Sequence, residues 1–275
     1  MTIKNWVLTG DTHGWVETRL GNISRNMPQF KPEETGIIIL GDAGLNFWLN
    51  KSDIKHKKAT AEYGYMIYCV HGNHEERPEN IANYYLIYDE NVGNLVWVED
   101  DFPNIRFLVS GNEYKFNEHP TLVIGGAYSV DKHYRLARAA AAGESFSGWF
   151  QSEQLTAREK LQIQEKIENK FYDFVFTHTT ALSWEPNDLF IGGVDQSTVD
   201  KSMEIWLDEL KDTFTWDVWC FGHYHADRVE RPHVEQFYQD YEDLEVVWER
   251  WKRFNSTGEL DWWIPKSPMF YAEEK

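Results

Sequence analysis

The stretch NWVLTGDTHG, at residues 5–14, carries the pattern that decides the fold. Its first half, Asn5–Thr9, is an apolar run of strand length. Gly10-Asp11-Thr12-His13-Gly14 follows, where glycine permits a sharp turn that brings short polar side chains to the strand end. An amphipathic segment at about Val16–Asn26 predicts a helix, and the run Ile37–Leu40 predicts a second strand. This order indicates parallel strands at the start of a sheet.

The same alternation continues along the chain. Six further apolar runs predict strands: Tyr65–Val70, Asn94–Val98, Arg106–Val109, Thr121–Ile124, Asp173–Thr177 and Val218–Phe221. Three further segments predict helices: Asp53–Tyr63, Ala157–Lys170 and Ser197–Lys211. Thr156 and Glu159 form a capping-box pattern at the start of the second of these helices. Between Asn94 and Ile124 the strands follow each other closely across turn-like sequences, which favours antiparallel pairing there.

The C-terminal part of the chain has a different pattern. Tyr241, Leu244, Trp248 and Trp251 recur at three- and four-residue steps, and Gly258 is a helix stop signal. The sequence contains no internal repeat and no Gly/Ser linker. We therefore expect residues 1–275 to form a single domain, with an aromatic-rich extension at about residues 230–275 packed on it.

Composition and charge narrow the classes of function. The 275 residues are 42% hydrophobic and 26% charged, which is ordinary for a globular protein. No apolar run approaches the ~20 residues that a membrane helix needs. With 27 basic and 45 acidic residues the net charge is −18, which disfavours binding to nucleic acid. Only two cysteines, Cys69 and Cys220, are present, which fits a reducing, cytoplasmic setting.

Five short polar motifs stand at or just beyond the ends of predicted strands. They are Gly10-Asp11-Thr12-His13-Gly14, Gly41-Asp42, Gly72-Asn73-His74-Glu75, Thr177-His178 and Gly222-His223-Tyr224-His225. In open α/β sheets, ligands bind at the carboxyl ends of strands, so these side chains are expected to meet. The motifs contain five of the ten histidines.

The residue types in these motifs predict a metal site. Asp, Asn and His supply oxygen and nitrogen donors without thiolate, which suits Mn²⁺, Fe or Zn²⁺ and not a cysteine-based structural zinc. The motifs offer more candidate ligands than one tetrahedral ion takes. They fit two ions that share one carboxylate, as in two-metal hydrolases.

The motifs, in this order, resemble those of the calcineurin-like metallophosphoesterase family, in the form found in bacterial and phage members. The resemblance extends from Asp11 to His225. It implies an α/β fold, a four-layer α/β-β/α sandwich of two mixed sheets with flanking helices. It also implies two divalent transition-metal ions, with Mn preferred and Fe or Zn as alternatives.

The resemblance further implies a role for each motif residue. Asp11, His13 and His225 would hold the first metal, and Asp42 would bridge. The second metal would take Asn73, His178 and His223. His74 is similar to the histidine that touches the substrate and protonates the leaving oxygen while a metal-bridging hydroxide attacks phosphorus.

Other residues bear on the substrate. In the branch that includes protein serine/threonine phosphatases, a phosphate-binding arginine occupies the position of Asn46, so the chain departs from that branch. Lys132 and Arg135, after a strand and a glycine pair, are candidates for binding a substrate phosphate, and a loop entering a helix is the alternative reading. His71 is interpreted as structural. Four lysines at positions 51, 55, 57 and 58 form either a solvated helix face or a second phosphate site.

The function expected from these features is hydrolysis of a small phosphate ester or nucleotide. Two alternatives remain open, a nuclease of the DNA-repair-like branch of the family and a non-catalytic metal-holding regulatory module. The partner expected is a small phosphorylated substrate, without membrane or nucleic-acid binding. The sequence carries no signal for an oligomeric state.

Overall fold

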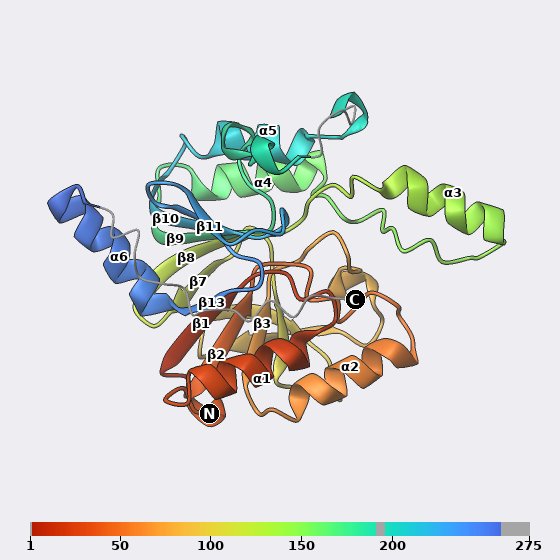
Figure 1. The fold of residues 1–275 in the computed structure, drawn as a ribbon, viewed down its shortest axis with the longest axis horizontal. Coiled ribbons are helices and arrows are strands. Elements are labelled where there is room, and N and C mark those ends of the chain that lie inside the picture. Colours follow the sequence, from red (N-terminus) through yellow and green to blue (C-terminus); the bar gives the residue numbers. More distant parts are fainter. Residues whose placement is uncertain (1, 191–195, 260–275) are drawn as a thin grey trace.

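The computed structural model describes residues 2–190 and 196–259. In this part of the chain two mixed sheets face each other, with helices on their outer sides (Figure 1). The seven-stranded sheet has the order β13-β1-β2-β3-β6-β5-β4, and the six-stranded sheet has the order β11-β12-β10-β9-β8-β7. The predicted four-layer α/β-β/α sandwich is therefore confirmed. The last residues of the aromatic-rich extension, 260–275, lie outside the described residues.

The strands are β1 Asn5–Thr9, β2 Thr35–Ile39, β3 Met66–Cys69, β4 Tyr85–Asp89, β5 Asn94–Val98, β6 Ile105–Leu108, β7 Glu113–Phe116, β8 His119–Ile124, β9 Phe171–Thr177, β10 Thr215–Phe221, β11 Arg228–Arg231, β12 Val234–Gln236 and β13 Tyr241–Asp243. The α-helices are α1 Val16–Asn26, α2 Lys51–Ala61, α3 Lys132–Ala142, α4 Ala157–Ile167, α5 Ser202–Leu210 and α6 Leu244–Thr257. Short 3₁₀ helices occur at Pro32–Glu34, Pro78–Asn80, Leu182–Trp184, Asn187–Leu189 and Gln196–Thr198.

Strand β1 shows how the sequence pattern produces the layers. It pairs in parallel with β2, which in turn pairs in parallel with β3, as the β-α-β order predicted. Successive side chains of a strand point to opposite faces. Trp6 and Leu8 therefore join the core between the sheets, whereas Val7 joins the core under the outer helices.

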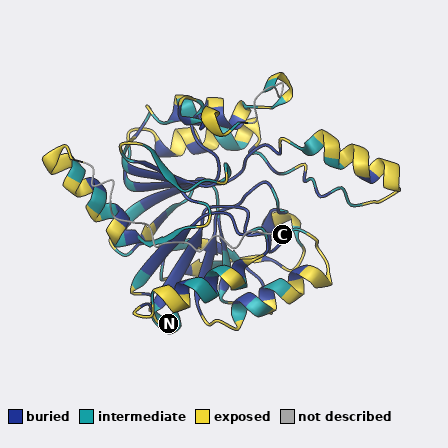
Figure 2. Cartoon of the chain, viewed as in Figure 1, coloured by how far each residue is buried: buried dark blue, intermediate teal, exposed yellow. Residues whose placement is uncertain are grey.

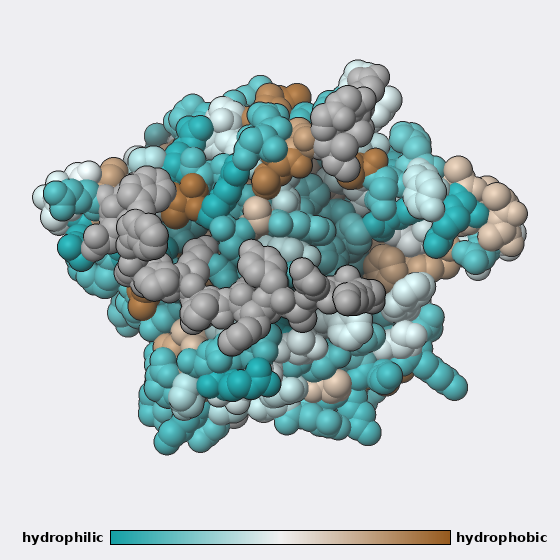
Figure 3. All heavy atoms as spheres, in the orientation of Figure 1, coloured by the Kyte–Doolittle hydropathy of each residue, from teal (hydrophilic) through white to brown (hydrophobic). Residues whose placement is uncertain are grey.

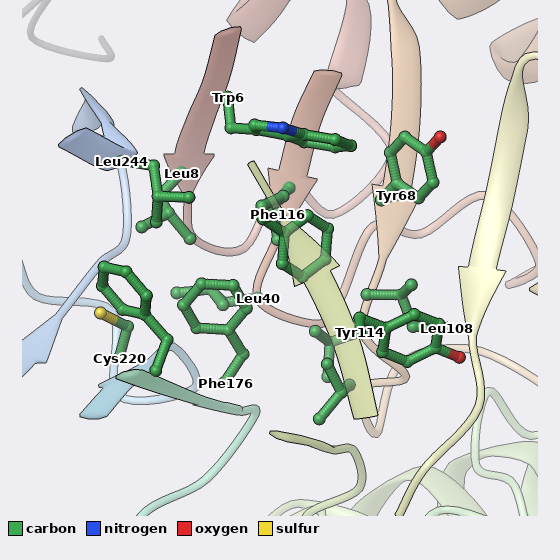
Figure 4. Packing of buried hydrophobic residues seen from close by; sticks show 14 of the residues in the cluster. Trp6, Leu8, Leu40, Tyr68, Leu108, Tyr114, Phe116, Phe176, Cys220 and Leu244 are labelled. Carbon is green, nitrogen blue, oxygen red and sulfur yellow. The ribbon is translucent and has the colours of Figure 1, made fainter. Parts of the chain in front are cut away.

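The core between the two sheets is rich in aromatic side chains (Figure 4). Trp6 lies edge-on to Phe116 at 4.8 Å and to Tyr68 at 5.1 Å between ring centroids. These rings come from both sheets, since Phe116 belongs to β7 and the other two to β1 and β3. Edge-to-face pairs at this spacing add to the free energy of area burial, and they hold the two sheets in one relative position.

Helices α1 and α2 lie on the outer side of the first sheet, and α4 and α5 on the outer side of the second (Figure 1). Helix α4 begins with the predicted capping box, in which Thr156 and Glu159 satisfy each other's backbone amides. Helix α3 belongs to neither layer: it projects from the body and is mostly exposed (Figure 2). The surface in this view is largely hydrophilic, and the end of α3 is more hydrophobic (Figure 3).

The expectation of one antiparallel unit between Asn94 and Ile124 is correct in part. Strands β5 and β6 pair antiparallel, and so do β7 and β8. However, β6 pairs in parallel with β3, and β7 begins the other sheet. The chain crosses between sheets at Gly111, whose φ of 79° is a conformation that favours glycine.

Two helices begin later than the sequence predicted. The helix expected from Ser197 is α5, which starts only at Ser202, because the Asp200 carboxylate accepts the Ser202 amide at 2.9 Å. In the extension, Tyr241 is not part of the helical face, because it lies in β13, which pairs antiparallel with β1. None of the helices in the described part of the chain has the length and apolar character that crossing a bilayer requires.

The four lysines of α2 do not form one surface cluster, which corrects that expectation. Lys57 is only 5% exposed, and its Nζ lies 2.5 Å from Glu99 Oε1, which is also buried. The hydroxyl of Tyr84 donates to the same carboxylate at 3.0 Å. Lys57 therefore stabilises a buried carboxylate, and only the other three lysines face solvent.

Replacing Lys57 with methionine should lower the free energy of unfolding by about 3–5 kcal/mol, because the buried Glu99 carboxylate loses its charge partner. The control is Lys55→Met on the exposed face of the same helix, which should change stability by less than about 0.5 kcal/mol. Urea unfolding at neutral pH measures both. Equal midpoints for the two variants would contradict a structural role for Lys57.

Candidate metal centre

The polar motifs meet where the carboxyl ends of parallel strands converge. Asp11, Asp42 and Asn73 follow β1, β2 and β3 in the first sheet. His178 and His223 follow β9 and β10 in the second sheet. Because the two sheets face each other with these edges at the same end, side chains from five strands reach one place.

Asp11 is buried, and histidines surround its carboxylate. Its Oδ1 accepts the backbone amide of His223 at 3.0 Å. Its Oδ2 lies 3.5 Å from His225 Nε2 and 3.8 Å from His13 Nε2. Burial alone would raise the pKa of Asp11, but hydrogen bonding with His225 and the charge of His178 lower it.

Asp42 is buried and presents one carboxylate oxygen to His178 and the other to His13 and His74. Its Oδ1 accepts the backbone amide of His74 at 2.7 Å and lies 3.5 Å from His178 Nε2. Its Oδ2 lies 3.9 Å from His13 Nδ1 and 4.0 Å from His74 Nε2. Burial opposes ionisation, yet the surrounding histidines hold the pKa of Asp42 well below its ordinary value, so this carboxylate is ionised at neutral pH.

His178 is fixed by a backbone acceptor on one side. Its Nδ1 lies 2.9 Å from the Leu40 carbonyl oxygen, which can only accept, so Nδ1 carries a hydrogen and Nε2 points into the site. Nε2 lies 2.9 Å from Asn73 Oδ1. Burial lowers the pKa of His178, but the charges of Asp42 and Asp11 outweigh it and raise the pKa to about 9.

Asn73 and His223 complete this side of the site. The Asn73 amide donates to Ser129 Oγ at 3.0 Å, which turns the Asn73 oxygen toward His178. The His223 ring lies 5.0 Å from the His178 ring, between centroids. Burial and the positive charge of His178 lower the pKa of His223 to about 3, so its ring is neutral and has a lone pair available for a metal.

Four residues at this site have positive φ, a backbone conformation that residues other than glycine rarely adopt. His13, Asp42, His223 and His225 have φ values of 46°, 48°, 70° and 53°. Each left-handed residue of this kind costs on the order of 1–3 kcal/mol and persists only where the surrounding structure imposes it. Strain therefore accumulates at the residues that supply the polar side chains.

Two glycines permit the close approach of the motifs to each other. A Cβ atom at Gly72 would overlap Asp42, including its backbone nitrogen, and one at Gly222 would overlap the Asp11 carboxylate. Each of these motifs therefore begins with a glycine that leaves room for the carboxylate of another motif. The sequence reveals the glycines, but only the fold reveals which side chain each one accommodates.

The geometry satisfies the first requirement for holding metal ions. Three overlapping groups each have donor atoms within 4.8 Å of one another: Asp11, His13 and His225; His13, Asp42 and His74; and Asp11, Asp42 and His178. Asp11 Oδ2 is buried, and the histidine nitrogens that face it are no closer than 3.5 and 3.8 Å. A buried, ionised oxygen with only such long contacts is costly unless a cation compensates it, so the donor set fits divalent ions.

The two candidate substrate-binding residues behave differently. Arg135 Nη2 lies 2.9 Å from His74 Nε2, and the guanidinium also donates to Asp131 at 2.7 Å and to the Gly148 carbonyl at 2.6 Å. Lys132 instead places its ammonium 4.2 Å from the centre of the Trp149 ring. Only Arg135 reaches the polar site.

Sequence reasoning missed two residues next to the site. Ser129 orients Asn73, and it lies in the segment after the glycine pair, where the sequence pointed only to the basic residues. Glu75 is fully buried, and burial together with the charge of Asp42 raises its pKa to about 8. His71, interpreted as structural, is buried with its Nε2 3.3 Å from the Glu75 carbonyl oxygen.

Comparison with known proteins identifies the family. The sequence model of the calcineurin-like phosphoesterases matches residues 6–227, most of the chain. The chain belongs to the calcineurin-like phosphoesterase family. This family consists of metal-binding hydrolases of phosphoric esters, and the motifs from Asp11 to His225 all lie within the matched region. No curated protein sequence matches the chain.

Two solved structures align with most of the chain. The protein TT1561 of Thermus thermophilus aligns over 88% of this chain and 98% of its own, at 12% identity and a TM-score of 0.38. The 5′-nucleotidase of Candida albicans aligns over 88% of this chain and 48% of its own, at 14% identity and a TM-score of 0.37.

Replacing Gly72 with alanine should displace Asp42 and weaken Mn²⁺ binding by about tenfold or more, comparable to disturbing the surroundings of a metal ligand. The control is Gly21→Ala in α1, where the new Cβ would meet only the flexible end of Tyr63, at 3.0 Å. That substitution should leave Mn²⁺ affinity unchanged. Calorimetric titration with Mn²⁺ measures both variants, and equal affinities would contradict the role assigned to Gly72.

Proposed function

We propose that this phosphoesterase uses two divalent metal ions to hydrolyse a small phosphate ester or a nucleotide. The observation that carries the proposal is the position of the Asp42 carboxylate. One of its oxygens lies 3.5 Å from His178, and the other lies 3.9 Å from His13. A carboxylate that presents one oxygen to each of two donor groups is what a ligand shared by two ions requires.

The proposed ligand sets follow the two sides of Asp42. Asp11, His13 and His225 would hold one ion, with Asp42 as the shared ligand. The other ion would take the side chains that follow β3, β9 and β10, namely Asn73, His178 and His223. The buried Asp11 Oδ2, and the ring orientation that the Leu40 carbonyl oxygen gives to His178, support these sets. Oxygen and imidazole donors suit Mn²⁺ best in this proposal and also accept Fe or Zn²⁺.

Bound ions of this kind neutralise charge on phosphoryl oxygens and lower the pKa of water. The protein contributes position and charge around them. Arg135 is held by Asp131 and Gly148 with its guanidinium at His74. A planar guanidinium binds two oxygens of a phosphate at once, so Arg135 would fix the orientation of the phosphoryl group.

His74 is the proposed general acid. Burial lowers its pKa, so the ring is neutral at neutral pH in the free protein. A phosphate dianion next to the ring and in contact with Arg135 would favour the protonated ring by adding negative charge. The protonated ring would then donate to the leaving oxygen as the bond from phosphorus to that oxygen breaks.

The net charge and the two cysteines bear on the proposed substrate and on the proposed cellular setting. The net charge of −18 disfavours a polynucleotide substrate, which supports a small phosphate ester over the nuclease alternative. Both cysteines are buried thiols, in keeping with a reducing, cytoplasmic setting.

A turnover screen with p-nitrophenyl phosphate, its bis-ester, cyclic nucleotides, dinucleotides and single-stranded DNA separates phosphoesterase activity on small substrates from nuclease activity. No turnover of any of them would favour the regulatory module.

The dinuclear proposal predicts close to two Mn²⁺ ions per chain after reconstitution and dialysis. Asp42→Asn removes the shared negative charge and should abolish turnover of p-nitrophenyl phosphate, with at least one ion lost. Asp101→Asn, at an exposed acidic position, is the control and should bind and turn over normally. Elemental analysis that finds a single ion in the active wild-type protein would refute the dinuclear arrangement.

The acid role of His74 predicts a dependence on the leaving group. His74→Ala should lower turnover of an alkyl phosphate by roughly 10²–10⁴-fold, the usual contribution of a positioned proton donor. For p-nitrophenyl phosphate the loss should be much smaller, because that leaving group departs without a proton. The half-buried His56 on α2 provides the control variant, His56→Ala. Equal losses for both substrates would argue that His74 serves another purpose.

A further inference from the structure

A row of aromatic rings extends outward from His74. The Phe47 ring stacks near-parallel to the His74 ring, with 6.2 Å between centroids and 20° between planes. Phe47 contacts Trp48 at 4.9 Å and Phe146 at 5.6 Å, and Trp48 contacts Phe146 at 5.8 Å. We call Phe47, Trp48 and Phe146 the aromatic shelf.

The shelf is fixed in position before any ligand arrives. The buried Asp53 carboxylate accepts the backbone amides of Trp48 at 3.0 Å and of Leu49 at 2.7 Å. Behind the shelf, the buried Phe150 packs against Phe47 at 6.0 Å. A ring that is already held in place loses little conformational freedom when a ligand stacks on it.

The outer end of the shelf is open to solvent. Trp48 keeps 48% of its surface exposed, although its neighbours and its backbone hydrogen bonds hold the loop in place. A large aromatic side chain that is held in place, exposed and linked to a polar site by one intervening ring is typical of a ligand-binding surface. Packing of the loop explains Phe47 and Phe150, but it does not explain the exposed indole.

We propose that the aromatic shelf binds the base of a nucleoside monophosphate whose phosphate lies at the metal centre. This inference rests on the proposed function and names its substrate class. The exposed indole of Trp48 is separated from His74 by the Phe47 ring, so a group stacked on it must be joined to the phosphate through a spacer. A ribose is such a spacer, whereas the ring of phosphotyrosine is bonded directly to the phosphate oxygen and would end against His74.

The charge of the chain points to a single nucleotide. A polynucleotide would extend across a surface with a net charge of −18, whereas a mononucleotide needs only the site and Arg135. Base–aromatic stacking tolerates every base, because each base has a π face. The shelf therefore selects nucleotides as a class and does not discriminate strongly among the bases.

The matched ligands for a test are AMP and ribose 5-phosphate, which differ only by the base. Methylene phosphonate analogues of both prevent hydrolysis during calorimetric titration of the Mn²⁺-loaded protein. We expect the wild-type protein to bind the AMP analogue about tenfold or more tightly than the ribose analogue, from stacking of one base. Trp48→Ala should bring this ratio of affinities close to one, and Trp48→Phe should keep most of it.

Tyr88→Ala is the control variant. Tyr88 is 63% exposed on β4, outside the shelf, and its loss should leave the ratio unchanged. A wild-type ratio near one, or a ratio that Trp48→Ala does not change, would overturn the proposal. Equal weakening of phosphotyrosine and AMP by Trp48→Ala would also overturn it, in favour of an aryl phosphate.

Failure of this inference can be told apart from failure of the proposed function. Turnover of ribose 5-phosphate or p-nitrophenyl phosphate without preference for AMP would support the proposed phosphoesterase activity and contradict base binding by the shelf. Trp48-dependent binding of the AMP analogue, without turnover of any of the three phosphates, would support nucleotide binding and contradict hydrolysis. Binding of neither analogue would overturn the shelf, and turnover would decide the function separately.

Discussion

The structure depends on two carboxylates, Asp11 and Asp42, that are buried at the edge where both sheets end. A buried charge is expensive, and here the compensation comes from histidines that belong to different strands. The second sheet must therefore sit where His178 can face Asp42. The aromatic core around Trp6 and Phe116 fixes that position. The charge compensation at the site therefore depends on how the two sheets pack.

Much of this arrangement could be predicted from the sequence because its signals are local. An apolar run followed by glycine and a short polar residue defines a strand end in either sheet, and parallel strands bring such ends together. Strand β1 and helix α1 have the predicted bounds for the same reason, since the apolar run of β1 and the helical period of α1 are set by neighbouring residues. The family pattern then connected Asp11 with His225 across most of the chain.

The rest could not be predicted because it arises from contacts between distant segments. Nothing near Lys57 in the sequence indicates that its partner is Glu99, so it looked like part of a basic surface. Similarly, Tyr241 has helical spacing with its neighbours, but it lies in β13, which pairs with the edge of β1 that would otherwise be open. Positive φ at Asp42 is a conformation imposed by tertiary structure, which local propensity disfavours.

The pairing of β13 with β1 has a consequence for how the protein is made. Thr9 donates to the Asp240 carbonyl oxygen at 2.7 Å across a sequence separation of 231 residues, so β1 is translated long before the segment that covers its edge. Such distant pairings are slow to form, and an uncovered edge is prone to aggregation. A nascent chain that has not reached His223 and His225 lacks two of the candidate metal ligands. The complete donor set therefore forms only after β10 has been translated.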